Sequence, residues 1–249
     1  YVCTPFKHII GDYAAALEQG ADTLVQYARA FGYGQSLGQD FTTTASIMPD
    51  PSEMTEWELG WAGAGQPVGQ GHTPGPQTTC MQNAVIAAAI ANDGVYTKPR
   101  TWLRVEDSEG NVVMENETSA HSAMKETTAY LLRDILESVI TSGTGTEAYF
   151  SGMTIAGKTG TTDDNRDRYF VGFSPYYCAA VWTGYESNDE LSYGMGNGSA
   201  QLWKQVMREI HGDLEDKAFD SCTGLTQVTV CSDSGLLATD ACTKDLRGN

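Results

Sequence analysis

A lysine and two threonines stand together in the second half of the chain, in the run Lys158-Thr159-Gly160-Thr161. The Asp- and Asn-rich segment 162–168 follows them, which is typical of a strand that ends in a turn. An ammonium group and two hydroxyls on one strand could hold the anionic group of an extended ligand. Gly160 leaves room for such a ligand to lie against the backbone. These residue types therefore indicate a binding site for an anionic, extended substrate.

The same stretch fits the phosphate-binding expression G-x-x-x-x-G-K-[ST], from Gly152 to Thr159. That motif requires a strand before it, a flexible loop inside it and a helix after it. Here the interior, 154–156, is itself strand-like, and the polar residues after Gly160 cannot begin an apolar helix. The context therefore argues against a nucleotide site.

The elements that must position this run are three sequential strands with helices on either side. β-Branched and aromatic residues predict strands over 154–161, 169–174 and 178–185. Helical spacing of apolar residues predicts helices over 124–142 and 200–211. We therefore expect the α/β (α+β) class, with an antiparallel sheet flanked by helices.

Other elements are expected earlier in the chain. Helical patterns cover 10–19, which Gly20 would end, then 22–31, and later 81–92, and a hairpin is expected over 101–115. Only Ala21 separates Gly20 from the second helix. This is an abrupt join, because helix connections usually span several residues.

The composition of the chain limits the classes of partner that it could bind. The chain has 249 residues, and its net charge of −17 makes nucleic acid an unsuitable partner, because phosphate binding needs clustered Lys and Arg. The longest apolar run, 84–91, is too short to span a membrane, and no signal peptide opens the chain. We therefore expect any membrane anchor to lie outside this sequence.

The last part of the chain is polar and carries cysteines. None of the six cysteines forms a C-x-x-C pair, so a zinc site is not expected. Cys231 and Cys242 flank a short loop, and a disulfide between them fits an extracellular protein, although spacing alone leaves the pairing open. We expect a main domain over 1–212 and a cysteine-containing extension over 213–249.

Several segments resemble one known family. The run GKTGTTDDNRDRYFVGFSPYYCAAVWTGY, 157–185, resembles the third motif and the next two strands of penicillin-binding protein transpeptidases. Segments 78–99 and 123–149 are similar to helices that the family carries before that motif. The ending CSDSGLLATDAC, 231–242, is similar to the tails of class A members, whereas some mid-chain features look closer to class B. The resemblance implies a β-lactamase/penicillin-binding-transpeptidase-like fold and no metal or organic cofactor.

Such enzymes carry three motifs, S-x-x-K, S-x-N and K-T-G, of which only the third is intact here. The best match to the first is Thr4-Pro5-Phe6-Lys7. Either Thr4 replaces the serine, or the sequence lacks residues between Pro5 and Phe6, and Lys7 is the motif lysine in both cases.

No S-x-N precedes Lys158, and in the family that motif falls between the segments joined here at Gly20-Ala21. We therefore hypothesise that segments are absent near 5–6 and near 20–21. Ser122-Ala-Met-Lys125 also spells S-x-x-K, but it lies close before the K-T-G run. Ser122 is expected to help cap the following helix instead.

The resemblance assigns roles to the run Lys158-Thr159-Gly160-Thr161. Lys158 would be the second cation beside Lys7, which lowers the pKa of Lys7 so that it can act as a base. Thr159, Gly160 and Thr161 would bind the substrate, with the hydroxyls on its carboxylate. The backbone N–H of Thr161 would be one donor of the oxyanion hole.

The implied activity is peptidoglycan D,D-transpeptidation through a serine acyl-enzyme, with stem peptides as substrates and β-lactams as acylating mimics. Two alternatives remain open: a D,D-carboxypeptidase or β-lactam-hydrolysing relative, and a non-catalytic β-lactam-binding sensor or scaffold. The implied location is the extracytoplasmic face of the bacterial membrane, with the cell-division or elongation machinery as a further partner.

Overall fold

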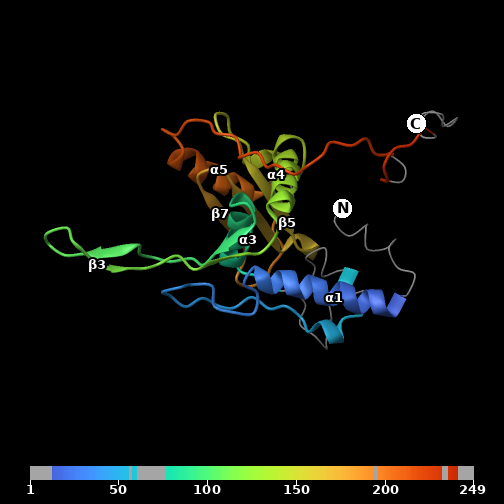
Figure 1. Cartoon of the computed structure of the whole chain (residues 1–249), viewed down its shortest axis with the longest axis horizontal. Coiled ribbons are helices and arrows are strands. Elements are labelled where there is room, and N and C mark those ends of the chain that lie inside the picture. Colours follow the sequence, from blue (N-terminus) through green and yellow to red (C-terminus); the bar gives the residue numbers. More distant parts are fainter. Residues whose placement is uncertain (1–12, 56–57, 61–76, 193–195, 232–234, 241–249) are drawn as a thin grey trace.

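The computed structural model describes residues 13–55, 58–60, 77–192, 196–231 and 235–240 (Figure 1). The elements of this part, in chain order, are α1 (Tyr13–Ala30), η2 (Pro51–Glu53), α3 (Cys80–Ala91), β1 (Val95–Thr97), β2 (Arg104–Glu106), β3 (Val112–Glu115), β4 (Ala120–Ser122), α4 (Glu126–Thr141), η3 (Thr146–Ala148), β5 (Ala156–Thr161), η4 (Asp163–Asn165), β6 (Asp167–Phe173), β7 (Cys178–Gly184) and α5 (Gly198–Ile210).

The central sheet has the strand order β5-β6-β7, and both pairings are antiparallel. Lys158 lies opposite Val171, and Tyr169 lies opposite Trp182. The three predicted strands are confirmed, with ends within two residues of the expected ones. The β-branched and aromatic runs form the strands, and short turns join them. Each turn returns the chain beside the strand it has just left, which gives this meander.

Helices cover both faces of the sheet, as expected. On one face α5 buries Trp203 and Met207 against Phe170. On the other face Ile90 of α3 packs with Phe173, and α4 contributes partly buried apolar residues to the same cluster. Side chains alternate between the faces along each strand, so one set of β-residues meets α5 and the other set meets α3 and α4.

The interpretation of two short helices divided at Gly20 is wrong. One helix, α1, runs through Gly20 without a break. An interior glycine costs a helix about 1 kcal/mol but removes no hydrogen bond, and burial of Ala21 and Val25 in a cluster with Met54 holds the helix together. The abrupt join therefore no longer supports an absent segment near 20–21, and that hypothesis stays a prediction resting on the absent S-x-N.

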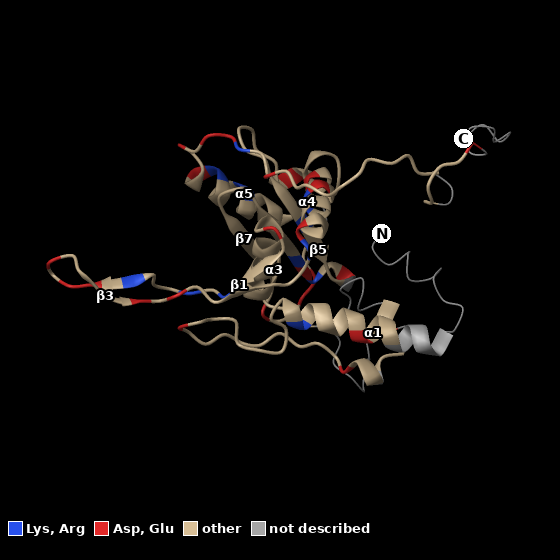
Figure 2. Ribbon diagram, viewed as in Figure 1, with Lys and Arg blue, Asp and Glu red and all other residues tan. Residues whose placement is uncertain are grey.

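Two small sheets lie between α3 and α4. The predicted hairpin is confirmed as β2 and β3, with its turn held by Asp107, whose carboxylate accepts from the N–H groups of Glu109 and Asn111. The hairpin projects from the body, and its tip is acidic (Figure 2). The pairing of β1 with β4 was not predicted, because these three-residue strands are distant in the chain: the paired residues Tyr96 and His121 are 25 positions apart.

The first residues of the expected C-terminal extension pack on the body. The Asp216 carboxylate accepts from the N–H of Thr154, at 2.9 Å, just before β5. The Phe219 ring meets the Phe173 ring edge-on at 5.3 Å. A domain boundary at 212–213 stays a prediction, and this docking argues that 213–220 and the main domain fold together.

Candidate active site

The strand β5 is an edge of the central sheet: among the described residues it pairs with β6 alone. The N–H of Thr162 donates to the carbonyl of Asp167 at 3.1 Å. Because hydrogen-bonded residues alternate along an antiparallel ladder, Lys158 and Gly160 also bond to β6. The N–H and C=O groups of Thr159 and Thr161 therefore point to the open edge, where an extended peptide can add as a further strand.

The lysine of the run reaches this open edge. Lys158 is two residues after Ala156, which packs in the cluster with α3 and α4, so its side chain leaves the sheet on that face. Its Nζ donates to the Thr159 carbonyl at 2.7 Å. Partial desolvation lowers the pKa of Lys158 below its ordinary value of 10.5. The ammonium is thus fixed beside the backbone groups that a bound strand would meet.

Thr159, the residue between Lys158 and Gly160, contacts the loop after α4. The hydroxyls of Thr159 and Thr144 lie 2.7 Å apart, while the Thr161 side chain is exposed. A Cβ on Gly160 would lie 3.1 Å from the Tyr169 Cβ, so the missing side chain makes room for Tyr169 as well as for a ligand. The sequence-predicted residues Lys158 to Thr161 are therefore together on one open edge.

The other predicted sites include residues whose positions the structure does not describe. Thr4, Lys7 and Cys242 lie outside the described residues, so the nucleophile, its lysine and the Cys231–Cys242 disulfide stay predictions. The nucleotide interpretation fails as expected, since β5 continues through Lys158 and only the three-residue η4 follows it.

The second S-x-x-K match is not an active site. Ser122 ends β4, and Lys125 is the residue before α4, so the two are not one helical turn apart. The expectation that Ser122 caps the helix is wrong: its hydroxyl donates to the Met124 carbonyl at 3.1 Å, and α4 has no side-chain cap. A β-strand here leaves Ser122 ahead of the helix rather than at its first turn.

A buried serine–histidine pair was not anticipated from the sequence. Ser174 Oγ lies 2.7 Å from His211 Nε2 and accepts from the N–H groups of Tyr176 and Tyr177. His211 Nδ1 lies 2.6 Å from the Met207 carbonyl. Every polar atom of the pair is occupied, and both side chains are buried, so this network closes the β6–β7 turn and offers no exposed nucleophile.

Replacing Lys158 by methionine is expected to stabilise the fold near neutral pH, because the desolvated charge is removed. The folded-state pKa lies below the unfolded value of 10.5. At any pH below the folded-state pKa, the folded wild type therefore carries the full cost of desolvating the ammonium. That cost disappears as the pH rises past 10.5, where both states are neutral. Urea unfolding of both proteins at about pH 7 and about pH 11 should show the variant's advantage shrinking. An advantage that grows with pH would contradict this.

The comparisons with known proteins agree with this geometry. Residues 10–208 match the family described as the penicillin binding protein transpeptidase domain. The chain belongs to this family. Penicillin-binding protein 1A of Clostridium perfringens is 36% identical over 161 residues, which are 64% of this chain and 19% of that protein.

Solved structures of the family share the fold. The D,D-transpeptidase domain of a peptidoglycan glycosyltransferase from Eggerthella lenta has a TM-score of 0.66 and 33% identity, over 80% of this chain and 51% of that one. Penicillin-binding protein A of Mycobacterium tuberculosis, solved as an imipenem acyl-enzyme complex, has a TM-score of 0.58 and 23% identity, over 78% of this chain and 44% of that one. The predicted fold class and family resemblance are confirmed, and the chain spans about a fifth of its curated relative.

Two absences hold for the part of the chain that the structure describes. No group of His, Cys, Asp and Glu in this part could hold a metal ion. None of its helices is both long and apolar enough to cross a membrane.

Proposed function

We propose that this penicillin-binding protein domain is a peptidoglycan D,D-transpeptidase that works through a serine acyl-enzyme. The observation that carries the proposal is the open edge of β5, where Lys158 Nζ sits on the Thr159 carbonyl. An extended D-Ala-D-Ala peptide would add to this edge by main-chain hydrogen bonds. Lys158 and the threonine hydroxyls would hold its terminal carboxylate by charge-assisted bonds.

The acyl transfer would proceed in two steps. The serine oxygen attacks the carbonyl of the penultimate D-Ala, the peptide bond breaks, and the terminal D-Ala leaves with a proton on its nitrogen. An amine of a neighbouring stem peptide then attacks the ester and releases the serine. The outward N–H of Thr161 would stabilise the oxyanion, an effect worth about 3–4 kcal/mol for one donor. Lys7 would take the serine proton, with Lys158 favouring its neutral form.

Thr4 supports a second candidate function. If Thr4 stands in place of the motif serine, the domain would bind D-Ala-D-Ala peptides or β-lactams and acylate slowly or not at all. It would then serve as a sensor or scaffold. A carboxypeptidase or β-lactam-hydrolysing relative would use the same open edge of β5 and would differ only in passing the acyl group to water.

Covalent labelling by a fluorescent penicillin tests the proposal. We expect the folded protein to label, and Thr4→Ala to abolish labelling if Thr4 is the nucleophile. A stem peptide with an amine acceptor should then give cross-linked product, whereas hydrolysed peptide alone would indicate a carboxypeptidase. Absence of labelling, while a control penicillin-binding protein labels in the same reaction, would refute acyl transfer by this chain.

The location and partners follow from the same proposal. Peptidoglycan stem peptides lie outside the cytoplasmic membrane, so the domain would work on the extracytoplasmic face, held by an anchor outside this sequence. The M. tuberculosis acyl-enzyme supports β-lactams as ligands of this fold. The cell-division or elongation machinery would be the further partner.

A further inference from the structure

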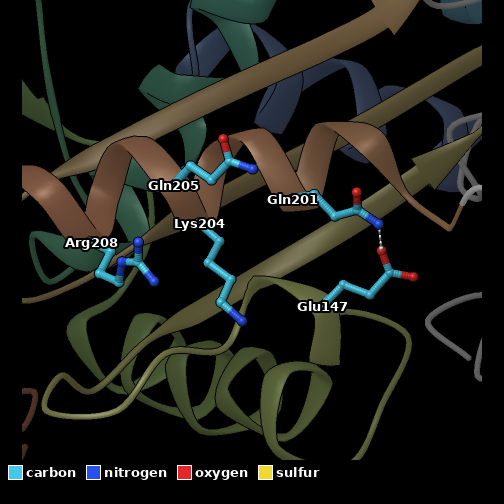
Figure 3. Close-up of a pocket in the computed structure, with 5 residues that line it drawn as sticks. All are labelled: Glu147, Gln201, Lys204, Gln205 and Arg208. Atoms are coloured by element: carbon cyan, nitrogen blue, oxygen red, sulfur yellow. Dashed lines mark hydrogen bonds between the residues drawn. The ribbon is translucent and has the colours of Figure 1, made fainter.

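A cavity of about 520 Å³ lies beside α5 (Figure 3). Each of its five lining residues carries a polar or charged group, with a carboxylate at one end and two cations toward the other. Four of the lining side chains come from α5 and one from η3: Gln201, Lys204, Gln205, Arg208 and Glu147.

One end of the cavity is a fixed carboxylate. Glu147 Oε2 accepts from the N–H of Asn197 at 2.9 Å and from Gln201 Nε2 at 2.8 Å. Both bonds use the same oxygen, which leaves Oε1 with capacity to accept from a ligand. The backbone bond also orients the carboxylate, so this end is prepared for a cation.

The other end carries two cations one helical turn apart. Lys204 is a partly buried residue, and its ammonium has no hydrogen bond or ion pair among the described residues. Among the described residues Arg208 forms an ion pair with its neighbour Glu209, at 3.7 Å, and its side chain is well exposed. This end is prepared for an anion.

We infer that this cavity binds a zwitterion of the amino-acid type, with its ammonium at Glu147 and its carboxylate at Lys204 and Arg208. Along α5, Lys204 is about 4.5 Å and Arg208 about 10.5 Å beyond Gln201, the helix partner of Glu147. A single amino acid or a dipeptide, at about 3.5 Å per residue, fits between these groups. The amides of Gln201 and Gln205 can bond to the backbone of such a ligand.

The inference goes beyond the proposed acyl transfer and does not depend on it. A nuclear magnetic resonance titration of the folded protein tests it, with glycine and glycylglycine as probes of the two lengths. N-acetylglycine, which lacks the ammonium, and ethylamine, which lacks the carboxylate, are matched controls. We expect the zwitterions to shift the signals of Gln201 and Lys204 and each control to bind about tenfold more weakly, the loss of roughly one charged hydrogen bond.

Variants connect the binding to the named charges. Lys204→Gln and Glu147→Gln should each weaken the zwitterion about tenfold. Lys217→Gln, which removes a lysine outside the cavity, and Lys158→Ala, at the β5 edge, should leave it unchanged. The inference is overturned if neither zwitterion binds, if N-acetylglycine binds equally, or if Lys158→Ala alone abolishes binding, which would place the ligand at β5.

Discussion

Replacing Arg133 by alanine is expected to lower the free energy of unfolding by about 2–4 kcal/mol, because a buried guanidinium and its charged hydrogen bonds are lost. The Arg133 side chain is only 3% exposed, and its Nη1 lies 2.6 Å from the Asp93 carboxylate. The same nitrogen donates to the Ile90 carbonyl at the end of α3, and Nη2 donates to the Asp220 carbonyl at 3.1 Å. One guanidinium therefore joins α3, α4 and the C-terminal segment.

Thermal and urea unfolding measure this effect, and the melting temperature should fall by roughly 10 °C, at about 2–4 °C per kcal/mol for a domain of this size. Arg133→Lys is the matched control: it keeps the charge but loses the planar fork, so it should be intermediate. Limited proteolysis should cut 213–220 sooner in both variants, because Asp220 loses its donor. Wild-type stability in Arg133→Ala would show that the network is not needed.

Replacing Lys158 by alanine is expected to slow penicillin labelling about 10²-fold, since it removes the cation that would hold the ligand carboxylate. The Lys158 side chain is exposed in the absence of ligand, and its only hydrogen bond within the described residues is to the Thr159 carbonyl. Its removal therefore leaves the core intact, and the loss of labelling should not come from unfolding.

The labelling rate at several penicillin concentrations separates binding from acylation. A variant that only binds poorly should recover its rate at high penicillin concentration, whereas a variant that has also lost the neutral form of Lys7 should not. Lys217→Ala is the control, because it removes a lysine that is not part of the Lys158 to Thr161 run. Unchanged labelling in Lys158→Ala would remove this residue from the mechanism.

These two positions differ in what the sequence could say about them. Lys158 was predicted because the signal lies in adjacent residues. A glycine, two threonines and a β-branched run beside it indicate both a strand and a polar binding edge. Arg133 was missed because its partners are 40 to 87 residues away in the chain. A single arginine on a predicted helix looks like a surface residue until the partners are brought together.

The distinction between signals in adjacent residues and contacts between distant residues also explains which other predictions were right and which were wrong. The α4 helix and the β5–β7 meander follow from periodicity within one segment, and both were predicted to within two residues. The division at Gly20 was wrong, because burial of Ala21 and Val25 outweighs the helix cost of one glycine. The pairing of Ser174 with His211 and the cavity between Glu147 and Lys204 needed the fold, since each joins segments on different elements.

By itself the sequence determined the antiparallel sheet between helices, the family, and the strand that carries the candidate residues Lys158 to Thr161, because these depend on residues adjacent in the chain. Only the tertiary structure decided that this strand is an open edge, with the Thr159 and Thr161 backbone groups facing outward. Strand order and hydrogen-bond register settle that point, and both depend on which distant segments pack together.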